Sequence, residues 1–241
     1  MTNDRELDPE DLWSEFPESN VVGDTALAAG KGVLSLIPGG GLLAETVGAA
    51  VAAKARERDE AFWRLVVGCL VQLGQKVESL LNENVTEDED FVAYAHRLLR
   101  ASQETADPVK RELLAKALAK SGSWSDLATS QRDRFTSLIS RYSMLHITLL
   151  NFFANPSAWL QKNSAEDAIG MTDNLGHVIR DHVINGDPVY PGEVLRVIAE
   201  LNRDDLTDIP SLTTAMTSNG TFSPRIKALG REFLDFIQLD S

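Results

Sequence analysis

The sequence predicts a mainly α-helical protein, a multi-helix bundle with an N-terminal helical hairpin and a C-terminal winged-helix-like module. Three observations predict this fold class. Apolar residues recur at the i, i+3, i+4 spacing of amphipathic helices through most of the 241 residues. Helix-start and helix-stop signals separate these segments. One polar stretch near the C-terminus, rich in Ser, Thr and Asn, favours short strands instead.

Residues 1–22 form an acidic segment, which we expect to be a flexible arm. The arm contains one apolar group at helical spacing, Leu12, Trp13 and Phe16. This group either folds back onto the body or is a candidate partner-docking segment.

The acidic start lacks the basic and apolar regions of a signal peptide. With a single cysteine the chain has no intrachain disulfide, so we expect a cytoplasmic protein.

The run of residues 32–53 contains only one charged residue, Glu45. Pro38 and the three glycines after it lie in the middle of this run and disfavour a single straight helix. The sequence therefore predicts a helical hairpin over residues 24–54, whose second arm begins near Leu42. Each arm is too short to cross a bilayer alone. The candidate residues for contact with a membrane or a partner are Leu34, Leu36, Ile37, Pro38, Leu42, Leu43 and Val47; packing in the bundle core is the competing interpretation.

A helical domain over residues 23–122 is predicted to continue from this hairpin. The charged stretch 54–60 leads into an amphipathic helix that ends near Leu81, and a helix unbroken from the second hairpin arm is one option. The four acidic residues 87–90 favour the start of the next helix through its dipole. Asp107-Pro108 is an N-cap followed by proline at the first helical position, and it begins a third helix.

The second domain, residues 123–241, is predicted to open with one long helix from near Trp124 to Phe153. Asn155-Pro156 ends that helix. Further helices are expected at 156–162, 172–185 and 191–202, the last with inward residues Val194, Leu195, Val197, Ile198 and Leu201.

The polar stretch 206–222 is the basis for the winged-helix-like interpretation. It favours two short strands, and Asn219-Gly220 is a typical hairpin turn. A closing helix then carries Ile226, Leu229, Phe233, Phe236 and Ile237. The competing interpretation is a plain helical bundle with one loop at 203–222.

The charge pattern disfavours specific binding of nucleic acid. The formal net charge is −13, whereas contact with phosphates depends on Lys and Arg. No basic residue lies between Arg203 and Arg225 in the predicted wing. We therefore expect a winged-helix-like module to serve as a protein-interaction module.

No catalytic, cofactor or metal motif is present in the sequence. Gly30-Lys31-Gly32 lacks the spacing and the Ser or Thr of a phosphate-binding loop. His177 and His182 are five residues apart and diverge on an α-helix. The chain has no HExxH or GxSxG pattern. We expect no enzyme, no cofactor and no metal, with Cys69 and His146 packed within helices.

Two parts of the chain carry a resemblance to a known group of proteins. The Gly/Ala-rich segment AGKGVLSLIPGGG at 29–41, with the charged stretch 54–63 after it, is one part, and LGREFLDFI at 229–237 is the other. With these features the chain resembles an uncharacterised bacterial helical family, which is distantly similar to abortive-infection proteins of phage defence. The resemblance implies a role in bacterial defence and carries over no site residue.

Together these features predict a non-enzymatic cytosolic interaction or regulatory protein. One alternative is a membrane-active effector that releases the 24–54 hairpin after a trigger. A second alternative is a winged-helix DNA-binding regulator. We expect a protein partner, while assembly into a homo-oligomer stays open.

Overall fold

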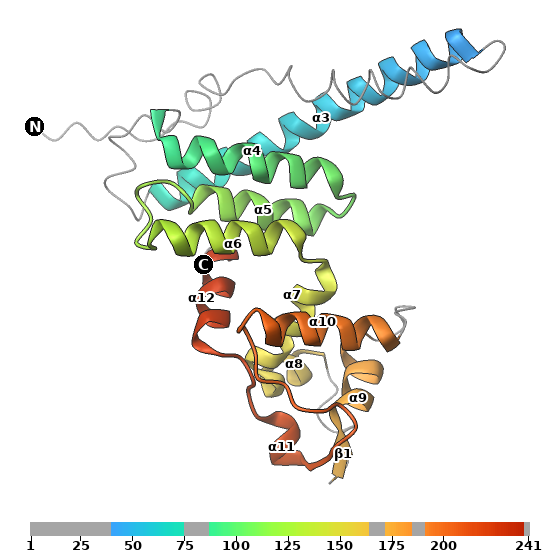
Figure 1. The fold of residues 1–241 in the computed structure, drawn as a ribbon, viewed down its shortest axis with the longest axis vertical. Helices are drawn as coiled ribbons and strands as arrows, with labels where there is room; N and C mark the ends of the chain where they lie inside the picture. Colours follow the sequence, from blue (N-terminus) through green and yellow to red (C-terminus); the bar gives the residue numbers. More distant parts are fainter. Residues whose placement is uncertain (1–39, 75–86, 164–171, 185–190, 239–241) are drawn as a thin grey trace, which may run out of the picture. The chain divides into compact units, whose positions relative to one another are not determined.

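The computed structural model describes residues 40–74, 87–163, 172–184 and 191–238 (Figure 1). Within these ranges the protein is mainly α-helical, as predicted. Its contacts divide the chain into two compact units: unit 1 ends at Arg141 and also takes Ile237 and the residues after it, and unit 2 is Tyr142–Phe236. The sequence analysis placed its domain boundary earlier, after residue 122.

The described residues of unit 1 form four helices that enclose an apolar core, and Figure 1 shows them side by side. These helices are α3 (Gly40–Gly74), α4 (Glu89–Glu104), α5 (Pro108–Ala119) and α6 (Thr129–Arg141). Helix α5 packs against the other three. The largest side chains of the core are fully buried: Phe62, Leu70, Phe91, Leu98, Leu114, Leu118, Phe135 and Ile139.

Helix α3 is one continuous helix of 35 residues. It begins at Gly40, two residues before the predicted second hairpin arm, and continues through the charged stretch 54–60. The unbroken option is therefore confirmed. Figure 1 shows its first turns extending beyond the other helices of unit 1. The first hairpin arm lies outside the described residues, and within them no helix is both long and apolar enough to cross a membrane.

Side-chain caps begin α4 and α5 where the sequence predicts. Asp88 Oδ1 accepts a hydrogen bond of 2.7 Å from the backbone N–H of Phe91. Asp107 Oδ1 accepts one of 2.8 Å from Val109, and Pro108 occupies the first helical position. Each carboxylate satisfies a backbone donor that has no partner within its own helix.

Unit 2 combines short helices with one two-stranded antiparallel sheet. In order its elements are α7 (Met144–Ala154), α8 (Pro156–Lys162), β1 (Thr172–Asn174), α9 (Leu175–Val178), a π-helical turn η4 (Ile179–Val183), α10 (Pro191–Arg203), β2 (Ala215–Thr217), α11 (Ser218–Phe222) and α12 (Ala228–Ile237). The strands pair with Thr172 opposite Thr217.

The long helix predicted from Trp124 to Phe153 is wrong, because the structure forms two helices there. Helix α6 ends at Arg141 and α7 begins at Met144. Ser143 is the N-cap of α7, with extended backbone, and it forms a capping box with His146 three residues later. This cap breaks a segment whose apolar periodicity continues without interruption.

The hairpin predicted at Asn219-Gly220 is also wrong. Residues 218–222 form helix α11, and the Thr217 side chain caps its start by accepting a hydrogen bond of 3.4 Å from the Gly220 N–H. Strand β2 pairs with β1 instead of with residues 206–209. Ile226 precedes the closing helix and forms an isolated antiparallel bridge with Thr207.

Two cations are buried in unit 1 with polar partners. Lys110 is 5 % exposed and its Nζ donates a hydrogen bond to the backbone oxygen of Ile139 at the end of α6. Arg132 is equally buried and bonds the backbone oxygen of Ser121 (2.9 Å) and the carboxylate of Asp90 (2.7 Å). Burial lowers the pKa of Lys110 from 10.5 to about 8, although the charge of Asp107 opposes this shift.

The buried ammonium predicts an unusual pH dependence of stability. Between pH 8 and 10.5 the unfolded chain binds more protons at Lys110 than the folded chain does, so this residue's contribution to the free energy of unfolding should rise with pH. In Lys110→Met that contribution is absent. The free energy of unfolding of the natural chain minus that of the variant, from urea titrations at pH 7.5 to 9.5, should rise by up to about 1.4 kcal/mol per pH unit. A difference that stays constant would contradict the assignment.

Two glycines in helices should respond to alanine in opposite ways. A Cβ on Gly230 in α12 would lie 2.3 Å from the Leu206 backbone oxygen and 2.7 Å from Ile226 Cγ1, whereas one on Gly68 in α3 meets nothing within 4 Å. We expect Gly230→Ala to lower the free energy of unfolding by about 1–3 kcal/mol. Gly68→Ala should raise it by roughly 0.5–1 kcal/mol through helix propensity. Thermal unfolding of the two variants checks both signs.

Candidate functional site

Helix α10 of unit 2 presents an outward face with an exposed apolar centre. Its opposite side carries the predicted buried residues Val194, Val197, Ile198 and Leu201. The prediction that Leu195 also turns inward is wrong, because its position on the helix points away from the buried side. It is 56 % exposed, the highest value for a large apolar side chain within the described residues. Ala199, one helical turn further on, is exposed on the same side. We call Leu195, Ala199 and the neighbouring Arg196 the α10 face.

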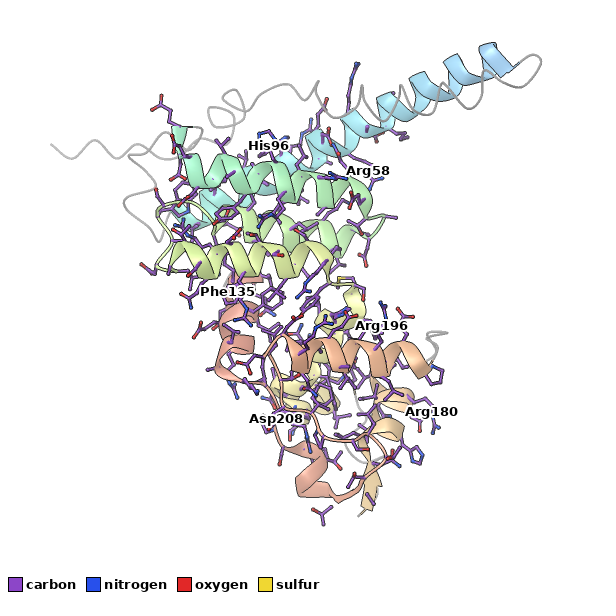
Figure 2. All side chains as sticks on the ribbon, viewed as in Figure 1. Arg58, His96, Phe135, Arg180, Arg196 and Asp208 are labelled. Atoms are coloured by element: carbon purple, nitrogen blue, oxygen red, sulfur yellow. The ribbon has the colours of Figure 1, made fainter. Side chains whose placement is uncertain are left out.

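One arginine of the α10 face lies between two carboxylates. Arg196, which Figure 2 places on α10, lies 3.7 Å from Glu193 and 3.7 Å from Glu200. It can therefore share its charge between two carboxylates along the same helix. The face has an apolar centre with a mixed polar border, which is typical of protein contact surfaces.

A buried histidine on α7 holds the helix that carries this face. His146 is 3 % exposed, and its Nε2 lies 2.8 Å from Glu200 Oε2 on α10. The hydrogen bond from His146 is the largest cause that holds the pKa of the Glu200 carboxyl below its usual value, and the charge of Arg196 adds to it. Glu200 therefore stays ionised while it anchors α10 to α7.

The hydrogen bonds of His146 define which ring nitrogen carries the proton. The Ser143 backbone N–H donates to Nδ1 over 3.2 Å, so Nδ1 acts as the acceptor. Nε2 then carries the proton and donates it to Glu200. The Ser143 hydroxyl lies 2.9 Å from the same Nδ1. Ser143, His146 and Glu200 thus form one connected chain of hydrogen bonds.

Tyr142 ties this chain to the end of α10. Its ring stacks on that of His146, with centroids 4.4 Å apart and 9° between the planes. Its hydroxyl donates a hydrogen bond of 2.6 Å to Asp204 Oδ2, one residue after α10. Phe233 of α12 packs edge-on against the same ring, with a centroid distance of 5.9 Å. The Tyr142 ring, itself held by Asp204 and Phe233, covers one face of the His146 ring and restricts its orientation.

Two exposed basic residues elsewhere in unit 2 also have acidic neighbours. Arg180, on η4 in Figure 2, pairs with Asp181 at 2.6 Å, and Lys227 pairs with Asp205 at 2.6 Å. These local ion pairs disfavour the use of the two cations in phosphate contacts.

Within the described ranges, no group of three or more His, Cys, Asp or Glu residues is arranged to hold a metal ion. His177 is near Asn174, at 3.3 Å between Nδ1 and Nδ2. Cys69 is buried in unit 1, and burial raises the pKa of its thiol to about 11. A thiol with such a pKa stays protonated at neutral pH and is a poor nucleophile.

Most of the candidate residues from the sequence lie outside the described ranges. This holds for Leu12, Trp13 and Phe16 of the acidic arm and for Leu34, Leu36, Ile37 and Pro38 of the first hairpin arm and its turn. Leu42, Leu43 and Val47 belong to the first turns of α3, for which the structure describes the backbone alone.

The sequence analysis missed the polar chain beneath α10. Ser143 and His146 are three residues apart, as the two residues of a capping box are, but histidine stands where glutamate or glutamine is usual. That spacing was the one local signal available. Glu200 lies 54 residues further along the chain, so only the fold brings it to His146.

No family model, curated protein or solved structure matches the chain. Its function is therefore inferred from the geometry of the described residues.

The tyrosine contact at the end of α10 leads to a stability prediction. Tyr142→Phe removes the hydrogen bond to Asp204 and keeps the stacked ring, so the free energy of unfolding should fall by about 1–2 kcal/mol. Tyr94→Phe is the matched control, because its hydroxyl contacts the Thr129 backbone oxygen over 3.4 Å. We expect the control to lose less in a urea titration, and equal losses would contradict a strong Tyr142–Asp204 bond.

Proposed function

We propose that this chain is an interaction or regulatory protein that binds a protein partner through the α10 face. The observation that carries the proposal is Leu195, which is 56 % exposed on a helix whose other side is buried. Exposing a leucine to water costs free energy that a partner recovers when it covers the side chain. Its exposure at the centre of a mixed polar border supports such a contact.

The attachment of α10 supports the same proposal. Glu200 bonds His146 of α7 and Asp204 accepts from Tyr142, so two anchors lie one helical turn apart. Asn202 bonds the Thr207 hydroxyl (2.8 Å) and the Ile209 N–H (3.0 Å) in the segment after the helix. A contact face held in this way loses little conformational entropy when a partner binds.

The order of elements around α10 supports a winged-helix-like module as part of this proposal. Strand β1 precedes the helical pair of α9 with η4 and α10, and β2 follows it and pairs back with β1. In this interpretation α10 is the second helix of a helix-turn-helix, the element that such modules present to their target.

A protein target is better supported than DNA for this module. Recognition of DNA uses several Lys or Arg contacts to phosphates. Arg196 is shared between Glu193 and Glu200, and Arg180 pairs with Asp181. The α10 face has an exposed leucine at the place where a DNA-reading helix needs polar contacts to bases. A role in bacterial defence rests on the family resemblance alone.

Helix α3 supports a second candidate function, a membrane-active effector. Residues 40–53 of this helix carry one charge, Glu45, and its first turns extend beyond α4, α5 and α6 in Figure 1. A helix segment with so few charges suits contact with a lipid surface or with a partner. The α10 face remains the first candidate because its side-chain exposure and anchoring are both described.

The α10 face can be tested with one pair of charge substitutions. Leu195→Glu places a carboxylate at the centre of the proposed contact, and Val109→Glu places one at a similarly exposed site on α5, where Val109 is 51 % exposed. Tagged full-length chains are used to capture proteins from a lysate of the source cells. We expect a specific partner to bind the natural chain and Val109→Glu, and to bind Leu195→Glu at least about tenfold less. A partner that binds all three chains equally would exclude the α10 face.

A further inference from the structure

We propose that Ser143, His146 and Glu200 form a hydrolytic site for small carboxylic esters, in which Ser143 Oγ is the nucleophile. The three side chains follow the order nucleophile, base and carboxylate that activates serine in hydrolases. This inference goes beyond the interaction function and departs from the expectation of a chain without catalytic residues.

The distances and the burial of the three residues suit this chemistry. Ser143 is an exposed residue, whereas His146 is buried. Ser143 Oγ lies 2.9 Å from His146 Nδ1, and His146 Nε2 lies 2.8 Å from Glu200 Oε2. Both distances fall within the range required of a nucleophile, its base and the group that orients the base.

The protons are placed correctly for general-base catalysis. Nδ1 accepts from the Ser143 N–H, so it is unprotonated, and its single lone pair is shared between this N–H and the hydroxyl 2.9 Å away. For Nδ1 to act as the base, the hydroxyl proton must replace the N–H at this lone pair. Nε2–H donates to the ionised Glu200, which stabilises the imidazolium once Nδ1 takes a proton. In most serine hydrolases Nε2 is the base and Nδ1–H donates to the carboxylate. Here Nδ1 is the base and Nε2–H donates to Glu200, and the order of proton transfers is the same.

The start of α7 supplies the electrostatic stabilisation that ester hydrolysis needs. Ser143 is the N-cap of this helix of 11 residues. The first N–H groups of a helix carry the positive end of its dipole. Those of His146 and Ile147 already donate to the Ser143 carbonyl oxygen, so an oxyanion formed on a carbonyl attacked by Ser143 would depend on the N–H groups of Met144 and Leu145.

The reaction balances with water as the second substrate. Ser143 Oγ attacks the ester carbonyl and its proton passes to His146 Nδ1. The tetrahedral intermediate collapses, the carbon–oxygen bond to the alcohol breaks, and Nδ1 returns the proton to the leaving alkoxide. Water then attacks the acyl-serine with Nδ1 as base, which releases the acid and restores the hydroxyl.

A purely structural cap is the alternative that the experiment must exclude. The contacts between Ser143 and His146 also form the capping box of α7. A cap has no need of a reactive hydroxyl, so the reactivity of Ser143 separates the two roles.

The test treats the full-length protein with an alkyl fluorophosphonate and maps the adduct by mass spectrometry. Attack by Ser143 forms a phosphorus–oxygen bond and releases fluoride, while His146 takes the proton. We expect Ser143 to react at least about a hundredfold faster than Ser137, an exposed serine on α6, because general-base assistance contributes about 10²–10⁴-fold. Labelling of Ser143 no faster than Ser137 would overturn the proposal.

Variants distinguish activation from simple exposure. His146→Asn should reduce labelling of Ser143 to the rate of Ser137, and Glu200→Gln should reduce it partly. Ser143→Asn keeps a good N-cap residue, so its circular dichroism should match the natural chain while its hydrolysis of p-nitrophenyl acetate falls to background. Unchanged hydrolysis in Ser143→Asn would overturn the proposal.

The site is also separable from the α10 face. Leu195→Glu changes the outward side of α10 and leaves Ser143, His146 and Glu200 in place. We expect this variant to keep full labelling of Ser143, so a failure of partner binding does not imply a failure of the hydrolytic site. Loss of labelling in this variant, with circular dichroism unchanged, would contradict a self-contained catalytic chain.

Discussion

The hydrogen bond between His146 and Glu200 is the contact on which the organisation of unit 2 depends. It is 2.8 Å long and joins α7 to α10 from a histidine that is 3 % exposed. A buried imidazole needs partners for both nitrogens, and the structure supplies Glu200 for one and Ser143 for the other. The Ser143 contact begins α7, and the Glu200 contact joins the same ring to α10.

This arrangement links the two proposals without making one depend on the other. The inward side of α10 meets His146 through Glu200, and its outward side presents Leu195. Protein interaction uses the exposed leucine, whereas hydrolysis uses the hydroxyl at the start of α7. The buried cations of unit 1 are satisfied differently. Lys110 and Arg132 donate hydrogen bonds to backbone oxygens, those of Ile139 and Ser121.

Part of the fold could be predicted because its signals are local. The helix start at the acidic residues 87–90, the cap Asp107, the proline at the start of α5 and four inward positions of α10 are short-range patterns, and the structure confirms them. The fifth predicted inward position of α10, Leu195, is exposed. Prediction failed where a helix cap or a strand pairing outweighed a local signal. Asn219-Gly220 favours a hairpin, but Thr217 caps a short helix there and β2 has its partner in β1. Likewise, apolar periodicity continues across Ser143, where the capping box starts a new helix.

The sequence by itself determined the helical class, the absence of a thiol pair and the positions of most helix starts, because each depends on residues within one or two turns. The tertiary structure alone decided which strand pairs with which, and which carboxylate meets His146. Glu200 is 54 residues from its partner. Contacts at such separations depend on how whole helices pack, and neither periodicity nor capping specifies that packing.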